Sequence, residues 1–427
     1  MRVAFDALLF CRLGVNRAII KKIQLSGRRV AGRQISEGGI NMNYVFISPN
    51  FPRGYSNFAV RLKAEGVNVL GLGQDKYDEL NNDLKRTLTE YYRVENMENY
   101  DEMLKAIGYF THKYGKIDRI ESHNEHWLMQ DARLRTDFNV PGLKSCDMDK
   151  MKYKSKMKEV FRSCGIPVAR GAVVKDEEEA MVLVSEYGYP VVVKPDMGVG
   201  AQDTMLLVSD RDVSDFFSTR AGKEYILEEY IEGDIHSYDG LVDQDGDVVF
   251  SSSFIFSNGI MDVVNSDLDI FYYSQKNIPD DLEEMGRKAV AAFGLKERFF
   301  HIEFFRTKLG ELVALEVNIR PPGGYSVDIW NFANDIDMYR QYAQVVARNT
   351  YDAILPGKYY CVYTGRKLTA NYRNSVDEVV YRYNTGILYH GEIPKILSKA
   401  LGDYAFIFRV EEFEDLRERV KFILEKK

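Results

Sequence analysis

Two glutamates and an asparagine stand in apolar sequence where charged groups are unusual. Residues 300–306 and 312–317 are rich in β-forming residues and flank Lys-Leu-Gly-Glu, which predicts a β-hairpin. Because side chains alternate along a strand, Glu303 takes one face of its strand, and Glu316 and Asn318 share a face of the next. Such oxygen ligands suit Mg²⁺ or Mn²⁺. Water molecules and substrate phosphates complete the coordination shell of these ions. Solvent exposure alone does not explain charges within apolar runs, where an unpaired carboxylate is costly.

A lysine at the end of an apolar strand predicts a phosphate site earlier in the chain. The strand expected over 189–195 ends with Lys194, and a charge in that position needs an anionic partner such as a nucleotide phosphate. Gly198 and Gly200 follow in a loop, where bare backbone can approach phosphates closely. The loop is not a Walker A motif, because it lacks the GxxxxGK[ST] pattern.

The preceding hundred residues alternate between strand and helix patterns. Strands are expected at 44–48, 67–72 and 117–122, with helices at 56–65 and 100–114 between them. This rhythm predicts a parallel sheet with crossover helices. Just past the third strand stands Glu125, where open α/β sheets place their ligands. Ligand binding and simple capping of the next helix explain that glutamate equally well.

The overall composition is that of a globular protein of two or three domains. The chain has 427 residues, of which 45% are hydrophobic and 28% charged. Its net charge of −7 gives no general attraction to nucleic acid or acidic membranes. The four cysteines form no CxxC pair, so neither a zinc site nor a disulfide framework is predicted. With no apolar run long enough to span a bilayer, a cytoplasmic location is expected.

The first 41 residues differ in charge from the rest of the chain. Residues 1–40 hold eight basic residues against two acidic ones. They fit either an Arg-rich targeting segment or sequence upstream of a natural start at Met42. We favour the second interpretation, because a clear strand begins at Tyr44 and the codons of residues 37–39 would resemble a bacterial ribosome-binding site.

Two segments near the end of the chain bear on the substrate. Residues 258–274 are polar and aromatic and too irregular for a core element, so they either line a substrate cleft or form a surface excursion. Residues 359–427 read as short strands and a closing amphipathic helix at 413–424, which we expect to complete a sheet.

In order, these motifs resemble those of one superfamily. A lysine-rich helix at 147–163, the strand ending in Val-Lys-Pro, the glycine loop, Leu-Glu-Glu-Tyr-Ile-Glu-Gly and the Glu…Glu-Val-Asn-Ile-Arg hairpin resemble the ATP-grasp superfamily of carboxylate–amine or carboxylate–thiol ligases. Biotin carboxylase and the large chain of carbamoyl-phosphate synthetase belong to it. The resemblance implies an α/β and α+β architecture. A Rossmann-like pre-ATP-grasp domain at 42–145 would precede two ATP-grasp subdomains at 146–223 and 224–427.

The resemblance implies a nucleotide site. Lys154 and Lys194 match the lysines that hold the ATP phosphates, with Lys150 and Lys156 as alternatives for the first. The matching residues of the glycine loop and of the adenine and ribose hinge are Gly198, Gly200, Glu228, Glu229 and Ile231. In the hinge, the backbone near Glu229 and Ile231 would bind adenine and a nearby carboxylate the ribose. His236 stands close to where many members carry a glutamate, and we include it among the nucleotide-binding residues.

The resemblance also implies a reaction. Glu303 and Glu316 match the metal-bridging glutamates, Asn318 the accompanying amide, and Arg320 the arginine beside the acyl phosphate. With Lys194, Arg320 would be catalytic. The expected enzyme activates a small carboxylate, such as an amino acid, as an acyl phosphate and couples it to an amine, releasing ADP and phosphate. A bicarbonate-using carboxylase and a non-catalytic ATP-binding protein are the alternatives, and homodimers are common among relatives.

Overall fold

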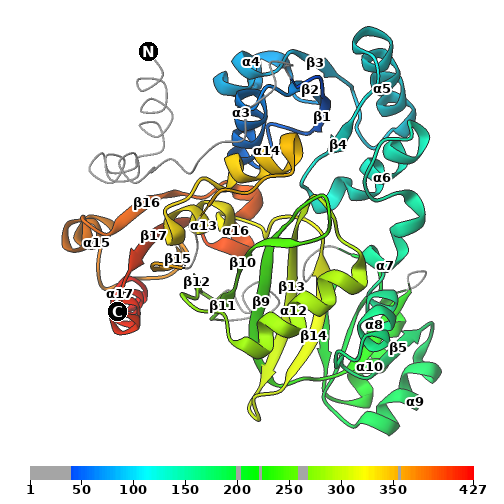
Figure 1. Cartoon of the computed structure of the whole chain (residues 1–427). Coiled ribbons are helices and arrows are strands. Elements are labelled where there is room, and N and C mark those ends of the chain that lie inside the picture. The colour runs from blue at the N-terminus through cyan, green and yellow to red at the C-terminus, as the bar shows by residue number, and fades with distance from the viewer. Residues whose placement is uncertain (1–39, 199–202, 221–223, 258–267, 354–356) are drawn as a thin grey trace.

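The computed structural model describes residues 40–198, 203–220, 224–257, 268–353 and 357–427. Three sheets organise these residues (Figure 1). The first domain lies at the top of the view, a nine-stranded sheet occupies the middle, and a smaller four-stranded sheet with its helices lies at the lower right.

The first domain is the parallel α/β unit that the strand–helix rhythm predicts. Its strands pair in the order β3-β2-β1-β4, all parallel. Side chains alternate across β1, so Tyr44 and Phe46 pack on one face and Val45 and Ile47 on the other, all fully buried. The elements are β1 (Asn43–Ile47), η2 (Arg53–Tyr55), α3 (Ser56–Ala64), β2 (Asn68–Gly73), η3 (Tyr77–Glu79), α4 (Asn82–Thr87), β3 (Glu90–Arg93), α5 (Tyr100–Tyr114), β4 (Arg119–Glu121), η4 (Glu125–Trp127) and α6 (Leu128–Asp137).

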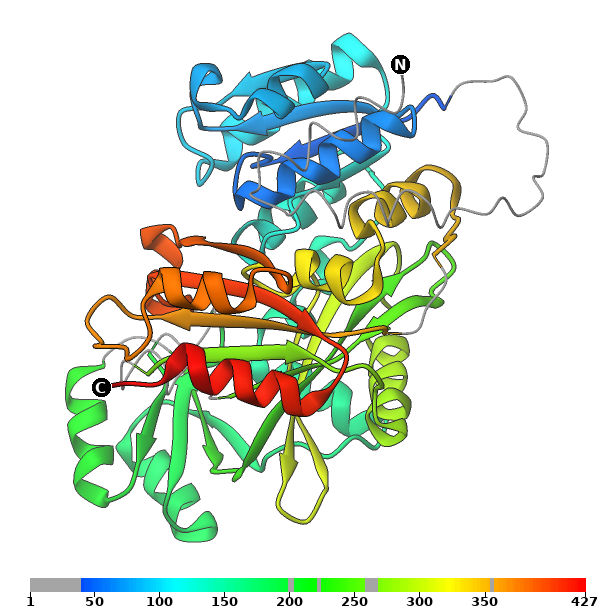
Figure 2. The same cartoon turned by 90° about the vertical axis from the view of Figure 1, so that its left-hand side faces the viewer.

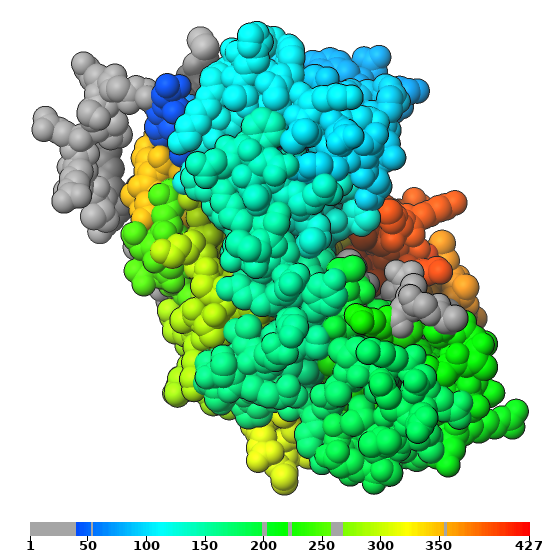
Figure 3. All heavy atoms as spheres, turned by 90° about the vertical axis from the view of Figure 1, so that its right-hand side faces the viewer, coloured from blue at the N-terminus to red at the C-terminus, as the bar shows by residue number. Residues whose placement is uncertain are grey.

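The smaller sheet has the antiparallel order β5-β8-β6-β7, covered by α9 and α10. Its elements and the segment that leads to it are η5 (Ser145–Asp147), α7 (Asp149–Lys152), α8 (Lys154–Ser163), β5 (Gly171–Val174), α9 (Glu177–Tyr187), β6 (Val191–Pro195), β7 (Met205–Leu207), α10 (Asp210–Thr219) and β8 (Tyr225–Glu229). In the space-filling view of Figure 3, this subdomain and the first domain share one face, joined by the segment carrying α6 to α8.

Two sequence expectations need correction in this region. The helix expected over 147–163 is interrupted at Tyr153, which is extended and forms a β-bridge to Met197. The break lets the Lys154 N–H donate to the Asp196 carbonyl at 2.9 Å, which ties the start of α8 to the end of β6. The expected boundary at 223/224 falls one strand too early, because β8 pairs with β5 and β6.

The large sheet runs in the order β14-β13-β9-β11-β12-β15-β17-β16, with β10 beside β9. It includes the predicted hairpin of β13 and β14, and α12 packs over β9. The elements are β9 (Gly233–Val242), β10 (Val248–Ser252), β11 (Phe254–Phe256), β12 (Ile270–Ser274), α12 (Asp280–Phe293), β13 (Arg298–Thr307), β14 (Leu312–Asn318), α13 (Ser326–Asn334), α14 (Met338–Arg348), β15 (Tyr360–Arg366), α15 (Val376–Tyr383), β16 (Ile387–Glu392), α16 (Lys395–Leu401), β17 (Tyr404–Val410) and α17 (Phe413–Leu424).

The C-terminal strands complete this sheet, as the sequence predicts, and α17 packs across β15 and β17 (Figure 2). The interpretation of residues 258–274 as too irregular for a core element is wrong for 270–274. These residues form β12, which pairs with β11 and β15, because their alternating apolar and aromatic side chains fill both faces of the sheet. Residues 258–267 lie outside the described residues. In the part of the chain that the structure describes, no helix is long and apolar enough to cross a membrane.

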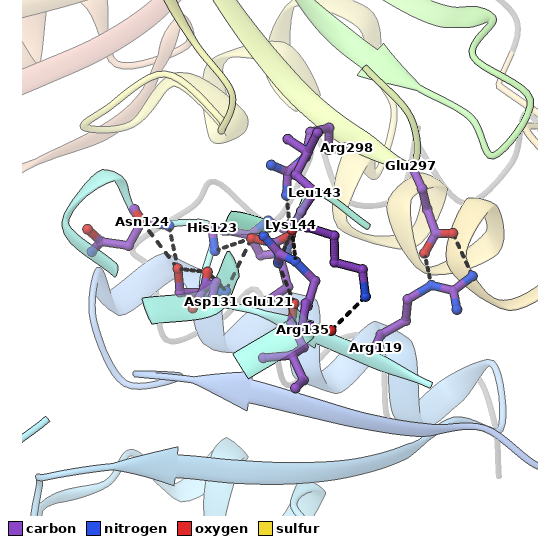
Figure 4. A network of polar contacts seen from close by, with 12 residues as sticks. Arg119, Glu121, His123, Asn124, Asp131, Arg135, Leu143, Lys144, Glu297 and Arg298 are labelled. Atoms are coloured by element: carbon purple, nitrogen blue, oxygen red, sulfur yellow. Dashed lines mark hydrogen bonds and ion pairs between the residues drawn. The ribbon is translucent and has the colours of Figure 1, made fainter. Parts of the chain in front are cut away.

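A buried polar network joins the first domain to the start of β13 (Figure 4). Glu121, at the end of β4, pairs with Arg298 and lies 3.6 Å from Arg135. Beside it, Arg119 donates to Glu297 at 2.7 Å. The first domain therefore fixes the end of the strand that carries Glu303.

Candidate active site

A cavity of about 560 Å³ is lined by residues of both the four-stranded sheet of β5 to β8 and the nine-stranded sheet. Most of the expected site residues line it. They are Lys154, Lys194, Glu228, Glu229, Ile231, Glu303, Glu316, Asn318 and Arg320. The order of motifs along the sequence therefore corresponds to one location in space.

The hairpin places its two glutamates directly opposite each other. Glu303 pairs with Glu316 in the strand register, and His301 pairs with Asn318. A register shift follows immediately after Glu303, and such bulges redirect side chains next to active sites. The Asn318 amide donates to Glu316 at 3.1 Å. The predicted convergence of these two carboxylates and one amide is present.

The carboxylate of Glu303 contacts a buried histidine. His301 Nε2 lies 3.3 Å from Glu303, and its Nδ1 lies 2.6 Å from Asp239, to which Ser237 donates at 2.5 Å. Burial alone lowers the pKa of His301, but the charges and hydrogen bonds of Asp239 and Glu303 outweigh it and raise the pKa to about 10. The two acids therefore favour the protonated imidazole, and its charge in turn lowers the pKa of Glu303.

This donor set fits a Mg²⁺ or Mn²⁺ ion. Glu303, Glu316 and Asn318 present oxygen atoms to the same cavity, the ligand chemistry that these ions prefer. Among the described residues, no three His, Cys, Asp or Glu side chains gather closely enough to form a closed metal site. A bound ion would thus complete its shell with water and phosphate oxygens, as Mg²⁺ usually does.

Three buried lysines converge around Glu228. Lys194 and Lys158 contact its two carboxylate oxygens at 2.9 and 3.0 Å. Burial would raise the pKa of Glu228, but the two lysines outweigh it and hold the pKa below its usual value. Lys154 lies close by, and burial lowers its pKa, partly offset by Glu316. Lys154 and Lys194 both line the cavity, which suits binding of a multiply charged phosphate.

The ribose role expected of a carboxylate near the hinge stays a prediction, and the side chain of Glu228 is already engaged. Both of its oxygens are taken by lysines, because β8 and β6 are neighbours and Glu228 pairs with Val192 beside Lys194. The side chain of Glu229 accepts from Arg170 at 2.8 Å, and its backbone N–H donates to the Arg170 carbonyl. An adenine role remains a prediction for the backbone at the partly buried Ile231, which lies between β8 and β9 and lines the cavity.

Glu125 lies behind the predicted catalytic arginine. Its carboxylate is 3.2 Å from Arg320 and accepts from Lys152 at 2.6 Å. Arg320 also donates to Asn318 at 3.3 Å and to the Pro321 carbonyl at 2.9 Å. The glutamate is 8% exposed and does not line the cavity. Of the two explanations considered for Glu125, the structure favours neither: it forms a buried ion pair that orients Arg320.

Of the remaining expected residues, some lie outside the cavity lining and one lies outside the described residues. His236 does not line the cavity, because strand alternation points it to the opposite face from Ile235, where Arg306 lies close to it. Lys156 is exposed and pairs with Glu159, and Lys150 does not line the cavity either, which favours Lys154 for the phosphates. Gly198 is described and lies beside Pro195, whereas Gly200 lies outside the described residues.

Sequence reasoning missed the supporting groups. Asp239 and Lys158 each hold a site residue, yet neither was singled out. A signal for Asp239 was present, since it is an acid within the strand sequence His-Ser-Tyr-Asp-Gly-Leu-Val, where a charge needs a partner. Lys158 gave no such signal among the other lysines of its segment.

The cavity gathers acidic, basic and amide side chains from both the four-stranded sheet of β5 to β8 and the nine-stranded sheet. Residues 187–328 match the family model described as the ATP-grasp domain. The chain therefore carries an ATP-grasp domain, and the family resemblance seen in the motifs is confirmed.

Similarity to individual proteins points the same way. The chain is 27% identical over 256 residues to an L-arginine-specific L-amino acid ligase of Bacillus subtilis, a match covering 56% of this chain and 62% of that ligase. The fold is shared with an L-amino acid ligase from Bacillus licheniformis, at a TM-score of 0.69 and 14% identity over 90% of this chain and 97% of the other. It is also shared with N5-carboxyaminoimidazole ribonucleotide synthetase in its ADP complex, at a TM-score of 0.66 and 17% identity over 90% and 96%.

Proposed function

We propose that this protein is an ATP-dependent ligase that joins a small carboxylic acid to an amine. The observation that carries the proposal is the meeting of three groups around one cavity: opposed carboxylates, buried lysines and Arg320. This arrangement binds phosphate and neutralises charge, and it needs no side-chain nucleophile. The similarity to amino acid ligases supports an amino acid as the acid.

The reaction follows from these positions. An oxygen of the substrate carboxylate attacks the γ-phosphorus of ATP, the bond from that phosphorus to the β–γ bridging oxygen breaks, and ADP leaves. The amine then attacks the carbonyl carbon of the acyl phosphate, loses a proton and expels phosphate. Lys154 and Lys194 offset phosphate charge, and Arg320 orients the carboxylate. A Mg²⁺ ion held by Glu303, Glu316 and Asn318 would supply further charge neutralisation.

Replacing Glu316 by glutamine tests the proposal. E316Q removes a charge from the cation site and keeps the side-chain volume, so ATP-dependent phosphate release in the presence of acid and amine should fall by about 100-fold or more. The measurement is phosphate release with a panel of carboxylic acids and amines, together with circular dichroism to check the fold.

A matched control is E311Q, since Glu311 lies exposed in the turn of the same hairpin. That variant should retain wild-type activity. If E316Q kept full activity, the proposal that Glu316 helps to bind the cation would be wrong. Phosphate release that depends on bicarbonate alone would support a carboxylase instead. A homodimer and a cytoplasmic location remain predictions.

A further inference from the structure

The cavity has two chemically different ends. Its charged side chains come from α8, β6, β8, β9, β13, β14 and Arg320, which form the nucleotide and cation end. A second part of the lining comes from β11, β12 and α16 and consists of Phe256, Ile270, Tyr272, Leu397, Ala400 and Leu401. Its other polar side chains in the described part of the chain are the neutral hydroxyls of Ser257 and Ser326. We call these six residues the apolar end.

The apolar end continues directly from the reacting groups. Arg320 is followed by Pro321, Pro322 and two glycines, and Pro322, Gly323 and Gly324 line the cavity with Arg320. A side-chain carbon on Gly324 would lie 3.1 Å from Leu401 and 3.3 Å from the Tyr272 hydroxyl. Glycine therefore lets the turn approach the far wall closely, and a carboxylate held at Arg320 would have this wall beside its remaining atoms.

Nearby acidic groups are engaged elsewhere. Asp269, next to β12, pairs with Lys426 at 3.0 Å and accepts from the Tyr372 hydroxyl. Asp328, in α13, accepts from the Tyr339 hydroxyl at 3.0 Å. Neither lines the cavity. A guanidinium or ammonium group at the apolar end would lose its hydration without gaining a counterion from the described residues, which is unfavourable. A carboxylate or phosphate there would be unfavourable for the same reason.

We infer that the carboxylic acid substrate carries a neutral, apolar side chain, aliphatic or aromatic, which packs into the apolar end. This rests on the proposed ligase function for the identity of the reacting group. It sets the chain apart from its arginine-specific relative, because burial of apolar area, not charge pairing, would select the substrate.

Binding and turnover with four amino acids test the inference separately from the ligase function. L-leucine, L-phenylalanine, L-arginine and L-glutamate are titrated by calorimetry into the MgADP-loaded protein, and phosphate release from MgATP is measured with each in the presence of the amine panel. The apolar pair should bind at least about tenfold more tightly than the charged pair.

The binding results test the apolar side chain of the substrate, and the phosphate-release results test the ligase function. Tighter binding of arginine or glutamate, or no binding of any of the four, overturns the inference. Phosphate release with a charged amino acid would still support the ligase. Binding of the apolar pair without phosphate release supports the inference and counts against the ligase.

A charge placed at the apolar end gives a second test. Ala400 is partly exposed in α16, so A400D introduces a carboxylate without disturbing a closed core. It should weaken L-phenylalanine binding by about tenfold or more and strengthen L-arginine binding, with MgADP affinity unchanged. The control is I396D, on the same helix but 75% exposed and outside the cavity lining. If A400D binds L-phenylalanine as tightly as I396D does, the inference is wrong.

Discussion

Charged residues at this site are held in pairs, and two of the supporting acids, Glu125 and Asp239, lie outside the cavity lining. Glu125 holds Arg320, Glu228 holds Lys194, and Asp239 holds the histidine that contacts Glu303. A buried charge without its partner is strongly destabilising. The supporting acids therefore fix where the cavity-lining groups point, and orientation is a large part of catalysis by charge neutralisation.

Replacing Glu125 by glutamine should misplace Arg320 while leaving the nucleotide site intact. We expect kcat with the acid identified by the substrate panel to fall by about 10- to 100-fold. MgADP affinity by calorimetry should change by less than about twofold, because Glu125 does not touch the lysine cluster. E125D should restore part of the activity, since it returns the charge.

The control for this prediction is E98Q, which alters an exposed glutamate of the same domain, 61% exposed at the side chain. It should behave as wild type. Equal losses of kcat and MgADP affinity in E125Q would show that Glu125 only supports the fold.

Among the elements, α12 lies unusually close to the central strand β9. Gly286 makes this possible, because a side-chain carbon at that position would lie 2.1 Å from the ring of the buried Tyr238. Tyr238 in turn stacks on Phe300 of β13, the strand that carries Glu303. The glycine thus sets the packing distance of a helix over the strands that form the cation site.

G286A should destabilise the protein even though alanine favours helix. The overpacking costs about 1–3 kcal/mol, more than the gain in helix propensity of about 1 kcal/mol. The matched change is G108A in α5, where a side-chain carbon meets nothing within 4 Å. G108A should stabilise the protein by about 0.5–1 kcal/mol. Urea unfolding of both variants measures the difference, and equal effects would contradict the packing argument.

At the scale of the molecule, the first domain contacts the large sheet through an aromatic cluster as well as through ion pairs. His123 lies among five aromatic rings, the nearest being Phe58 and Tyr342 at centroid distances of 4.5 and 4.7 Å. Burial lowers the pKa of this imidazole to about 4, against 6.5 for an exposed histidine. The fold therefore contains His123 in its neutral form.

This histidine makes the stability of the protein depend on pH. The unfolded chain protonates His123 near pH 6.5 and the folded protein only near pH 4, so its contribution is present above pH 6.5 and is lost as the pH falls toward 4. The loss amounts to about 3 kcal/mol.

H123N should make the free energy of unfolding less sensitive to pH over this window. Asparagine tolerates the positive φ of 57° at this position. Urea unfolding at several pH values provides the measurement, and H112N, at an exposed histidine of α5, should keep the wild-type slope. A slope unchanged in H123N would mean that other groups cause the acid sensitivity.

The sequence by itself determined most of the elements and the identity of the charged groups on the hairpin that line the cavity. Strand alternation and a glycine turn placed Glu303, Glu316 and Asn318 on one face, because these signals act between residues close along the chain. The same holds for the parallel first domain and for α17, whose bounds the hydrophobic pattern predicted.

Only the tertiary structure decided which charges pair. Glu125 and Arg320 are 195 positions apart, and Glu228 meets lysines from two different elements. No local pattern encodes such contacts, since they depend on how whole sheets pack. The apolar end likewise combines β11 and β12 with α16, which lies far from them in the sequence. The local sequence thus determines which chemical groups the site contains. Long-range packing determines how these groups are oriented and the shape of the cavity that we propose selects the substrate.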